Sequence, residues 1–147
     1  MQTERPANTW RIGKALCIFS AVTYGIVPAF IDTFDPHHLM NPDWPPHARL
    51  HLMWLNGAGL YLSLFSIYLF WTATRETFDR MRAGVAVGLL FLAGFFTAGL
   101  LKDAAGAAFD ADGRLLLGLA PPAIVHFCTS TVILLVGYAL CRKEIVK

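Results

Sequence analysis

Four of the five histidines lie in one short segment, residues 34–51, which joins two long apolar stretches of the chain. Imidazole changes charge near neutral pH and is the commonest metal ligand in proteins, so this segment is where we expect chemistry. His47 and His51 are four residues apart, which places both rings on one face of a helix that begins at Pro45-Pro46. The fifth histidine, His126, follows a second Pro-Pro pair. These spacings favour either metal binding or proton transfer.

Metal binding is one interpretation of the histidines. A pair at positions i and i+4 is a frequent ligand spacing in helical zinc motifs, so His47 and His51 together with His126 are candidate ligands for a divalent metal ion. A further ligand would come from one of three residues, Asp35, Asp103 or His38. The alternative is a hydrated loop whose histidines lie among lipid headgroups and bind nothing.

The two halves of the chain have a similar layout. In each, a long apolar stretch ends in an aspartate, Asp32 or Asp103, and the next stretch opens with two prolines and then a histidine, His51 or His126. Because a helix rises about 1.5 Å per residue, we expect the two histidines at similar depth, as one shared site would need. These four residues are the candidate catalytic groups, in which a histidine shuttles a proton and an aspartate orients it. Coincidence of common helix-start signals would give the same layout.

Four long apolar stretches must position these residues. The chain has 147 residues, of which 56% are hydrophobic and 15% charged, and its mean hydropathy is +0.52. A helix of about 20 residues crosses roughly 30 Å of hydrocarbon. The stretches that satisfy this length are Ile12–Ile31, Leu50–Trp71, Ala83–Leu101 and Pro122–Cys141. We therefore predict an all-α integral membrane protein, a single domain over residues 1–147 that forms a four-helix transmembrane bundle.

Positively charged residues predict the orientation of this bundle. Nine of the 12 lysines and arginines lie in the amino-terminal tail, the second loop and the carboxyl tail. Cytoplasmic loops retain positive charge, so we predict that both termini are cytoplasmic and that loops one and three are periplasmic, extracellular or lumenal. The Asp112-Gly113 pair in the third loop is a strong turn signal and predicts a short hairpin or lid over the outer face. The net charge of +2 is no argument for a nucleic-acid partner.

Small residues within the spans predict how the helices pack. Gly84 and Gly88 form a Gly-x-x-x-Gly pair, which lets helix backbones approach closely inside a bundle or at a dimer face. The three cysteines, Cys17, Cys128 and Cys141, lie within the predicted spans. We interpret them as small apolar packing residues rather than as a disulfide framework.

Two family resemblances add to this interpretation. One is carried by the stretch Asn41-Pro42-Asp43-Trp44-Pro45-Pro46-His47-Ala48-Arg49-Leu50-His51. It resembles the signature of an uncharacterised family of small four-span membrane proteins, which implies no reaction. The layout of four helices, with Pro28 and Asp32 in the first span and a Pro/Trp-rich loop before the second, resembles the EXPERA superfamily of emopamil-binding and sigma-2-receptor-like proteins. This second resemblance implies a pocket within the bundle for sterols or other lipophilic molecules, and in some members double-bond isomerisation by proton transfer.

Three classes of function remain open at this point, and none decides whether the protein is an enzyme. The first is binding of a lipophilic small molecule at the outer face, for which the candidate lining residues are Asn56, Trp54, Asp35 and Trp44. The second is the histidine-ligated metal site. The third is a non-catalytic accessory subunit of a larger membrane complex, or a homo-oligomer. Membrane lipid is an expected partner in all three.

Overall fold

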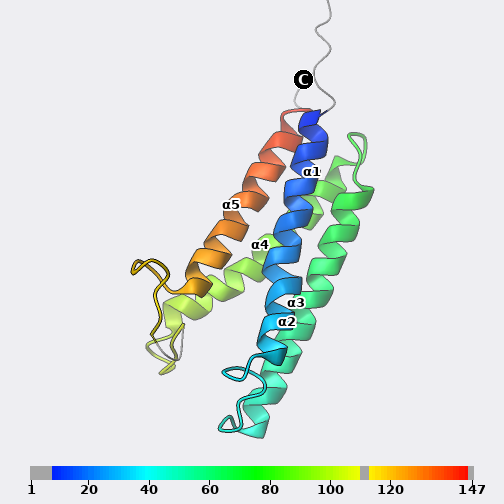
Figure 1. Ribbon diagram of the computed structural model, residues 1–147. Helices are drawn as coiled ribbons and strands as arrows, with labels where there is room; N and C mark the ends of the chain where they lie inside the picture. Colours follow the sequence, from blue (N-terminus) through cyan, green and yellow to red (C-terminus); the bar gives the residue numbers. More distant parts are fainter. Residues whose placement is uncertain (1–7, 110–112, 146–147) are drawn as a thin grey trace, which may run out of the picture.

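The computed structural model describes residues 8–109 and 113–145, which form four long helical rods (Figure 1). The first rod is continuous and consists of α1 (Asn8–Ala21), a π-helical turn η1 (Val22–Ile26) and α2 (Val27–Phe34). The other rods are α3 (Pro46–Thr72), α4 (Phe78–Leu101) and α5 (Pro122–Arg142). Each rod is long and apolar enough to cross a membrane. The predicted multi-pass, all-α architecture is therefore confirmed.

The helices extend beyond the predicted spans, mainly at their amino-terminal ends. α3 begins at Pro46, four residues before the predicted boundary, and α4 begins at Phe78, five residues before its predicted boundary. Prolines open α3 and α5, because a residue in the first turn of a helix needs no N–H donor. Hydropathy locates only the part of a helix that lies in the hydrocarbon. The predicted spans therefore left out the polar first turns of these helices.

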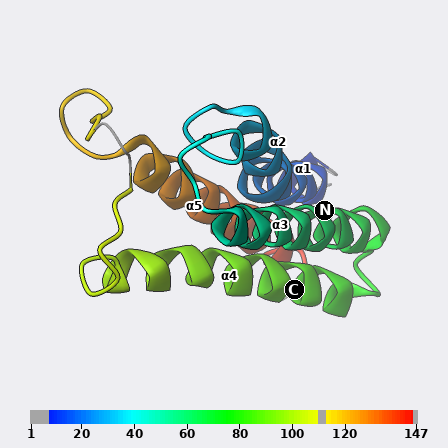
Figure 2. The ribbon, with the colours of Figure 1, turned by 90° about the horizontal axis from the view of Figure 1, so that it is seen from below.

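The rods are close together at one end of the molecule and diverge at the other (Figure 1). α1 packs mainly against α5, and α3 packs mainly against α4. We call the end where the rods are close together the closed end. Both ends of the described chain lie there, together with the α3–α4 connection. The first and third loops lie at the other end, where α2 and α3 separate from α4 and α5; Figure 2 shows the same separation from below.

Glycine and cysteine residues hold α1 against α5. A Cβ atom on Gly13 would lie 2.6 Å from Cys141 Sγ, and one on Gly137 would lie 2.8 Å from Cys17 Sγ. The two helices are antiparallel, so each glycine lies opposite the cysteine of the other helix. Cys17 and Cys141 are fully buried, and all three cysteines are free. The packing interpretation is confirmed for these two, whereas Cys128 is exposed on the outside of the bundle.

The Gly84-x-x-x-Gly88 pair is also used inside the bundle. A Cβ atom on Gly84 would lie 2.6 Å from the Phe70 ring, and one on Gly88 would lie 3.0 Å from Leu134 and from the Tyr24 hydroxyl. Both glycines are buried. The packing interpretation is therefore confirmed, and this pair is not available as a dimer face.

Polar contacts join the helices at the end of the bundle where the described chain begins and ends. Lys14 Nζ donates hydrogen bonds to the carbonyls of Trp71 and Ala73, at 2.8 and 2.9 Å. Carbonyls at the end of a helix lack partners within that helix, so this lysine of α1 caps α3. Arg75 and Glu144 form an ion pair of 3.1 Å near the same end.

The predicted lid of the third loop falls partly outside the described residues. Asp112 is among the residues that the structure does not describe, so its turn with Gly113 stays a prediction. A tight turn closes instead at Leu116 and Ala120, which form an isolated antiparallel bridge. Within it, Leu117 and Gly118 have φ angles of 52° and 70°.

Candidate functional site

A cavity of about 880 Å³ lies where the helices diverge. It is lined by residues of α2, α3, α4 and α5 and of the first and third loops. Much of its wall is aromatic: Phe95 stacks on Phe127 with 4.2 Å between ring centroids, and Phe109 lies 5.7 Å from Phe95. Phe91 and Trp44 also line the cavity. This wall is suited to an apolar molecule.

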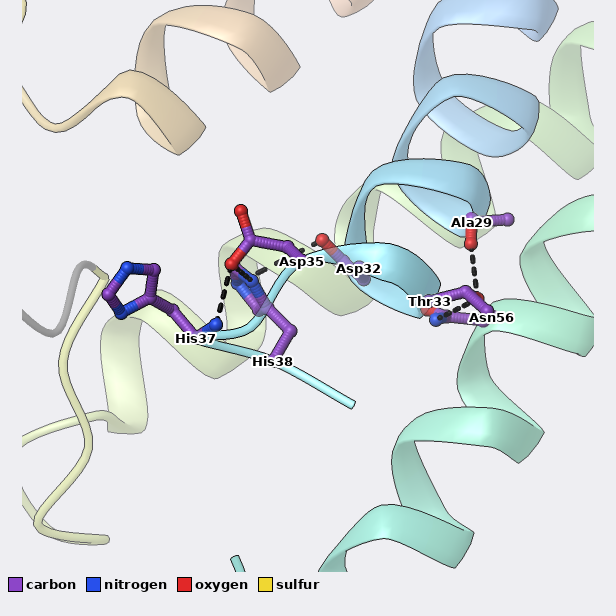
Figure 3. A network of polar contacts seen from close by, with 7 residues as sticks. All are labelled: Ala29, Asp32, Thr33, Asp35, His37, His38 and Asn56. Atoms are coloured by element: carbon purple, nitrogen blue, oxygen red, sulfur yellow. Dashed lines mark hydrogen bonds and ion pairs between the residues drawn. The ribbon is translucent and has the colours of Figure 1, made fainter. Parts of the chain in front are cut away.

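Carboxylates and imidazoles gather at the end of α2, on the polar side of the cavity (Figure 3). His38 lies between two aspartates, with Nδ1 3.4 Å from Asp35 Oδ1 and Nε2 3.9 Å from Asp32 Oδ1. The His37 main-chain N–H donates a hydrogen bond of 2.7 Å to Asp35 Oδ1. This N–H, together with His38, holds the pKa of Asp35 below its usual value. Asp35 is therefore ionised at neutral pH.

Two further polar contacts shape the cavity wall. His126 Nε2 lies 2.8 Å from the carbonyl oxygen of Thr23, which connects α5 to the first rod. Asn56 Nδ2 donates to Thr33 Oγ1 at 3.3 Å, and Thr33 donates to the Ala29 carbonyl (Figure 3). Polar groups in a span are costly to expose to lipid, so these bonds orient both side chains inward.

Six of the predicted candidate residues line this cavity, namely Asp32, Asp35, His38, Trp44, Asn56 and His126. The others lie elsewhere. His51 is exposed, with its ring 4.5 Å from His47, and Trp54 is 73% exposed beside His51. Asp103 is exposed and pairs with Lys102. None of these four residues is among the described residues that line the cavity.

The prediction that His51 and His126 share one site is not supported by these positions. His51 lies five residues after the start of α3 and His126 four residues after the start of α5, but the helices differ in length. α3 has 27 residues and α5 has 21, and both end near the closed end of the bundle. At about 1.5 Å per residue, the six extra residues move the start of α3 outward by about 9 Å. Figure 1 shows the start of α3 beyond the start of α5.

The three-histidine metal site is not assembled either. His47 Nε2 and His51 Nε2 are 3.0 Å apart, as their spacing predicted. His126 is bound to Thr23 instead and does not join them. Over residues 8–109 and 113–145, no group of three or more His, Cys, Asp or Glu side chains is arranged to hold a metal ion.

Sequence reasoning gave too little weight to His38 and to the phenylalanines. His38 was considered only as an additional metal ligand, although its position three residues after Asp35 was a signal for the contact that it makes. Phe91 and Phe95, at positions i and i+4 of α4, lie on one helix face and both line the cavity. The sequence shows this spacing, but it does not show that this face of α4 points toward a cavity.

Comparisons of the chain with protein-family models, with curated proteins and with solved structures found no match. The function must therefore be argued from the geometry of the site. The two family resemblances stay predictions, carried by the residues quoted for them.

Proposed function

We propose that this protein binds a lipophilic small molecule in the cavity between its diverging helices. The observation that carries the proposal is a cavity of about 880 Å³ that combines an aromatic wall with a small polar side. Ligand sites of this kind have volumes of about 300–1,000 Å³ and place a few polar groups in a mostly apolar lining. The ligand's apolar body would contact Phe95 and Phe127, and its polar group would face Asp32 and His126.

Proton transfer to the ligand is the chemistry that this arrangement could add. Asp32 and His126 line the same cavity. In the proposed reaction, His126 would move the proton and Asp32 would balance the charge, which general acid–base catalysis requires. The resemblance to the EXPERA superfamily suggests isomerisation of a double bond as the reaction to test first.

A cavity-filling variant tests binding directly. Ala98 lines the cavity, whereas Ala93 is an exposed residue of the same helix outside the lining. We expect Ala98→Trp to weaken binding of dehydroergosterol, a fluorescent sterol, by at least about tenfold, which corresponds to about 1.4 kcal/mol. Ala93→Trp should bind as the wild type does. The measurement is fluorescence of the sterol with protein in lipid nanodiscs, and empty nanodiscs report partition into lipid.

Equal sterol signals from both tryptophan variants and from empty nanodiscs would contradict the proposal.

Two histidine variants give a second comparison, because His126 lines the cavity and His51 does not. His126→Ala should weaken sterol binding, and His51→Ala should leave it unchanged. Weakening by His51→Ala alone would move the site to the exposed end of α3.

We also propose that the closed end of the bundle is cytoplasmic and that the cavity faces the periplasm, exterior or lumen. The support is the distribution of lysine and arginine, which favours the cytoplasm for the connections at that end. Single cysteines at Thr74 and at Met40, in a background without the native cysteines, test this orientation. A membrane-impermeant maleimide added outside cells should label the Met40 position only; the reverse pattern would invert the topology.

One observation favours a second function, metal binding by His47 and His51 alone. Their Nε2 atoms are 3.0 Å apart on an exposed helix turn, a separation that a single transition-metal ion can bridge. Water would supply the remaining ligands. Titration with Cu²⁺, followed by electron paramagnetic resonance, should show binding that His47→Ala and His51→Ala abolish and His126→Ala retains. Equal binding by all three variants would exclude this pair as the ligands.

A further inference from the structure

The turn η1 leaves the main-chain carbonyl of Thr23 without a helical donor. In an α-helix the N–H of residue 27 would donate to the carbonyl of residue 23. Here the Val27 N–H donates to the Val22 carbonyl, one residue further back. The next residue, Pro28, has no N–H with which to continue the π-helical pattern. The Thr23 carbonyl is therefore released from the helix.

The side chain of His126, in α5, forms a hydrogen bond with this carbonyl. Its Nε2 lies 2.8 Å from the Thr23 oxygen. A carbonyl oxygen can only accept, so Nε2 must carry the hydrogen. In the neutral ring the other nitrogen, Nδ1, then has a free lone pair. Nδ1 has no hydrogen-bond partner among the described residues, and the ring lines the cavity.

We propose that η1 and Pro28 act together as a positioning device that fixes His126 in the Nε2–H tautomer and presents Nδ1 to the cavity as an acceptor. The inference rests on the proposed function, because it names the kind of ligand group that the same cavity takes. With Nδ1 and the Asp32 carboxylate both accepting, the ligand's polar group should be a hydrogen-bond donor, such as a hydroxyl or an ammonium. A lipophilic ether or ester would lack the hydrogen that this side of the cavity needs.

The neighbouring hydroxyls support the assignment to the carbonyl rather than to the Thr23 side chain. Thr23 Oγ1 donates to the Ser20 carbonyl at 2.8 Å and lies 3.0 Å from Ser130 Oγ. Ser130 Oγ in turn donates to the His126 carbonyl. The Thr23 hydroxyl is thus engaged separately, and removal of it should leave the bond between His126 Nε2 and the main chain in place.

The tautomer can be measured without any ligand. Nitrogen-15 NMR of histidine-labelled protein in nanodiscs distinguishes the two neutral tautomers, at about pH 9, well above the usual histidine range. We expect the Nε2–H form for His126 in the wild type and in Thr23→Ala. Pro28→Ala returns an N–H to the helix as a competitor for the Thr23 carbonyl, so it should shift the population toward the Nδ1–H form.

An Nδ1–H tautomer in the wild type would overturn the inference, and so would a Pro28→Ala spectrum identical to that of the wild type. Should Pro28→Ala not assemble, the wild-type and Thr23→Ala spectra still decide the tautomer. These outcomes do not depend on whether the cavity binds a sterol.

The ligand preference needs a matched pair of probes. Dehydroergosterol carries a hydroxyl, and its 3-O-methyl ether has the same apolar body without the donor hydrogen. We expect the alcohol to bind about tenfold more tightly than the ether, and His126→Ala to reduce this ratio. Equal affinities would overturn the donor preference while leaving the proposed function intact. Failure of both probes to bind would count against the proposed function itself, and the tautomer experiment would then decide the positioning device alone.

Discussion

Substitution of Gly137 by alanine should weaken the contact between α1 and α5. The new Cβ would lie 2.8 Å from Cys17 Sγ, 2.8 Å from the Gly13 carbonyl oxygen and 3.0 Å from the Cys17 main-chain nitrogen. Ordinary van der Waals contact begins at 3.4 Å. The helices must therefore separate locally by about 0.6 Å, because two of these three atoms belong to the backbone and close-packed interiors leave little room for adjustment.

A separation of this size has a calculable cost. A gap of 0.5–1 Å forfeits roughly a quarter to a half of the attraction between contacting atoms, and overpacking in cores costs about 1–3 kcal/mol. Alanine also favours the helix by about 1 kcal/mol relative to glycine. Gly57→Ala separates the two effects, because a Cβ at Gly57 would meet nothing within 4 Å. We expect Gly137→Ala to be about 1–3 kcal/mol less stable than Gly57→Ala.

The assay is unfolding in mixed micelles at rising mole fractions of sodium dodecyl sulfate, followed by circular dichroism and tryptophan fluorescence. Gly57→Ala should unfold at or slightly above the wild-type midpoint, and Gly137→Ala below it. A Gly137→Ala midpoint equal to that of Gly57→Ala would refute the close approach of the two backbones. Cys17→Ala in the Gly137→Ala background should recover only part of the loss, since the Gly13 carbonyl stays in place.

Three further predictions concern polar groups. Lys14→Met removes both hydrogen bonds that cap α3 and should lower stability in the same assay by about 1–2 kcal/mol; an unchanged midpoint would show that the cap is dispensable. Ser63→Ala removes a buried bond of 2.6 Å to the Ala21 carbonyl and should cost about 0.5–1 kcal/mol. Asp35 has a lowered pKa, so its stabilising contact with the His37 N–H is complete above the usual carboxyl range and is lost as the pH falls through the lowered value. Carbon-13 NMR of the carboxyl group should give a midpoint below about 3.9, and a midpoint at or above that value would contradict the contact.

The helical spans were predictable because lipid leaves few alternatives. A segment in hydrocarbon must satisfy its main-chain hydrogen bonds internally, so apolar length alone predicts a helix such as Pro122–Arg142. The contact between Gly13 and Cys141 was predictable only in part. Their small size indicated packing, but the choice of partner helix depends on the whole bundle.

The cavity could not be predicted in the same way. Its residues come from four helices and two loops, and hydropathy gives neither the rotation of a helix nor its divergence from a neighbour. Pro28 in a span was a visible signal, yet the π-helical turn before it and the released Thr23 carbonyl depend on the register of the main chain. His51 was misplaced relative to His126 because depth was counted from the helix starts, without the difference in helix length.

The pairing of α1 with α5 has a consequence for biosynthesis. About 100 residues separate the end of α1 from the start of α5, which is about 5–20 s of translation at 5–20 residues per second. Until α5 has been synthesised, the surface of α1 at Gly13 and Cys17 lacks the helix that packs against it. The bundle closes only when its last helix arrives. A ribosome that stalls before residue 122 would thus leave an unpaired first helix for the membrane's quality-control proteases.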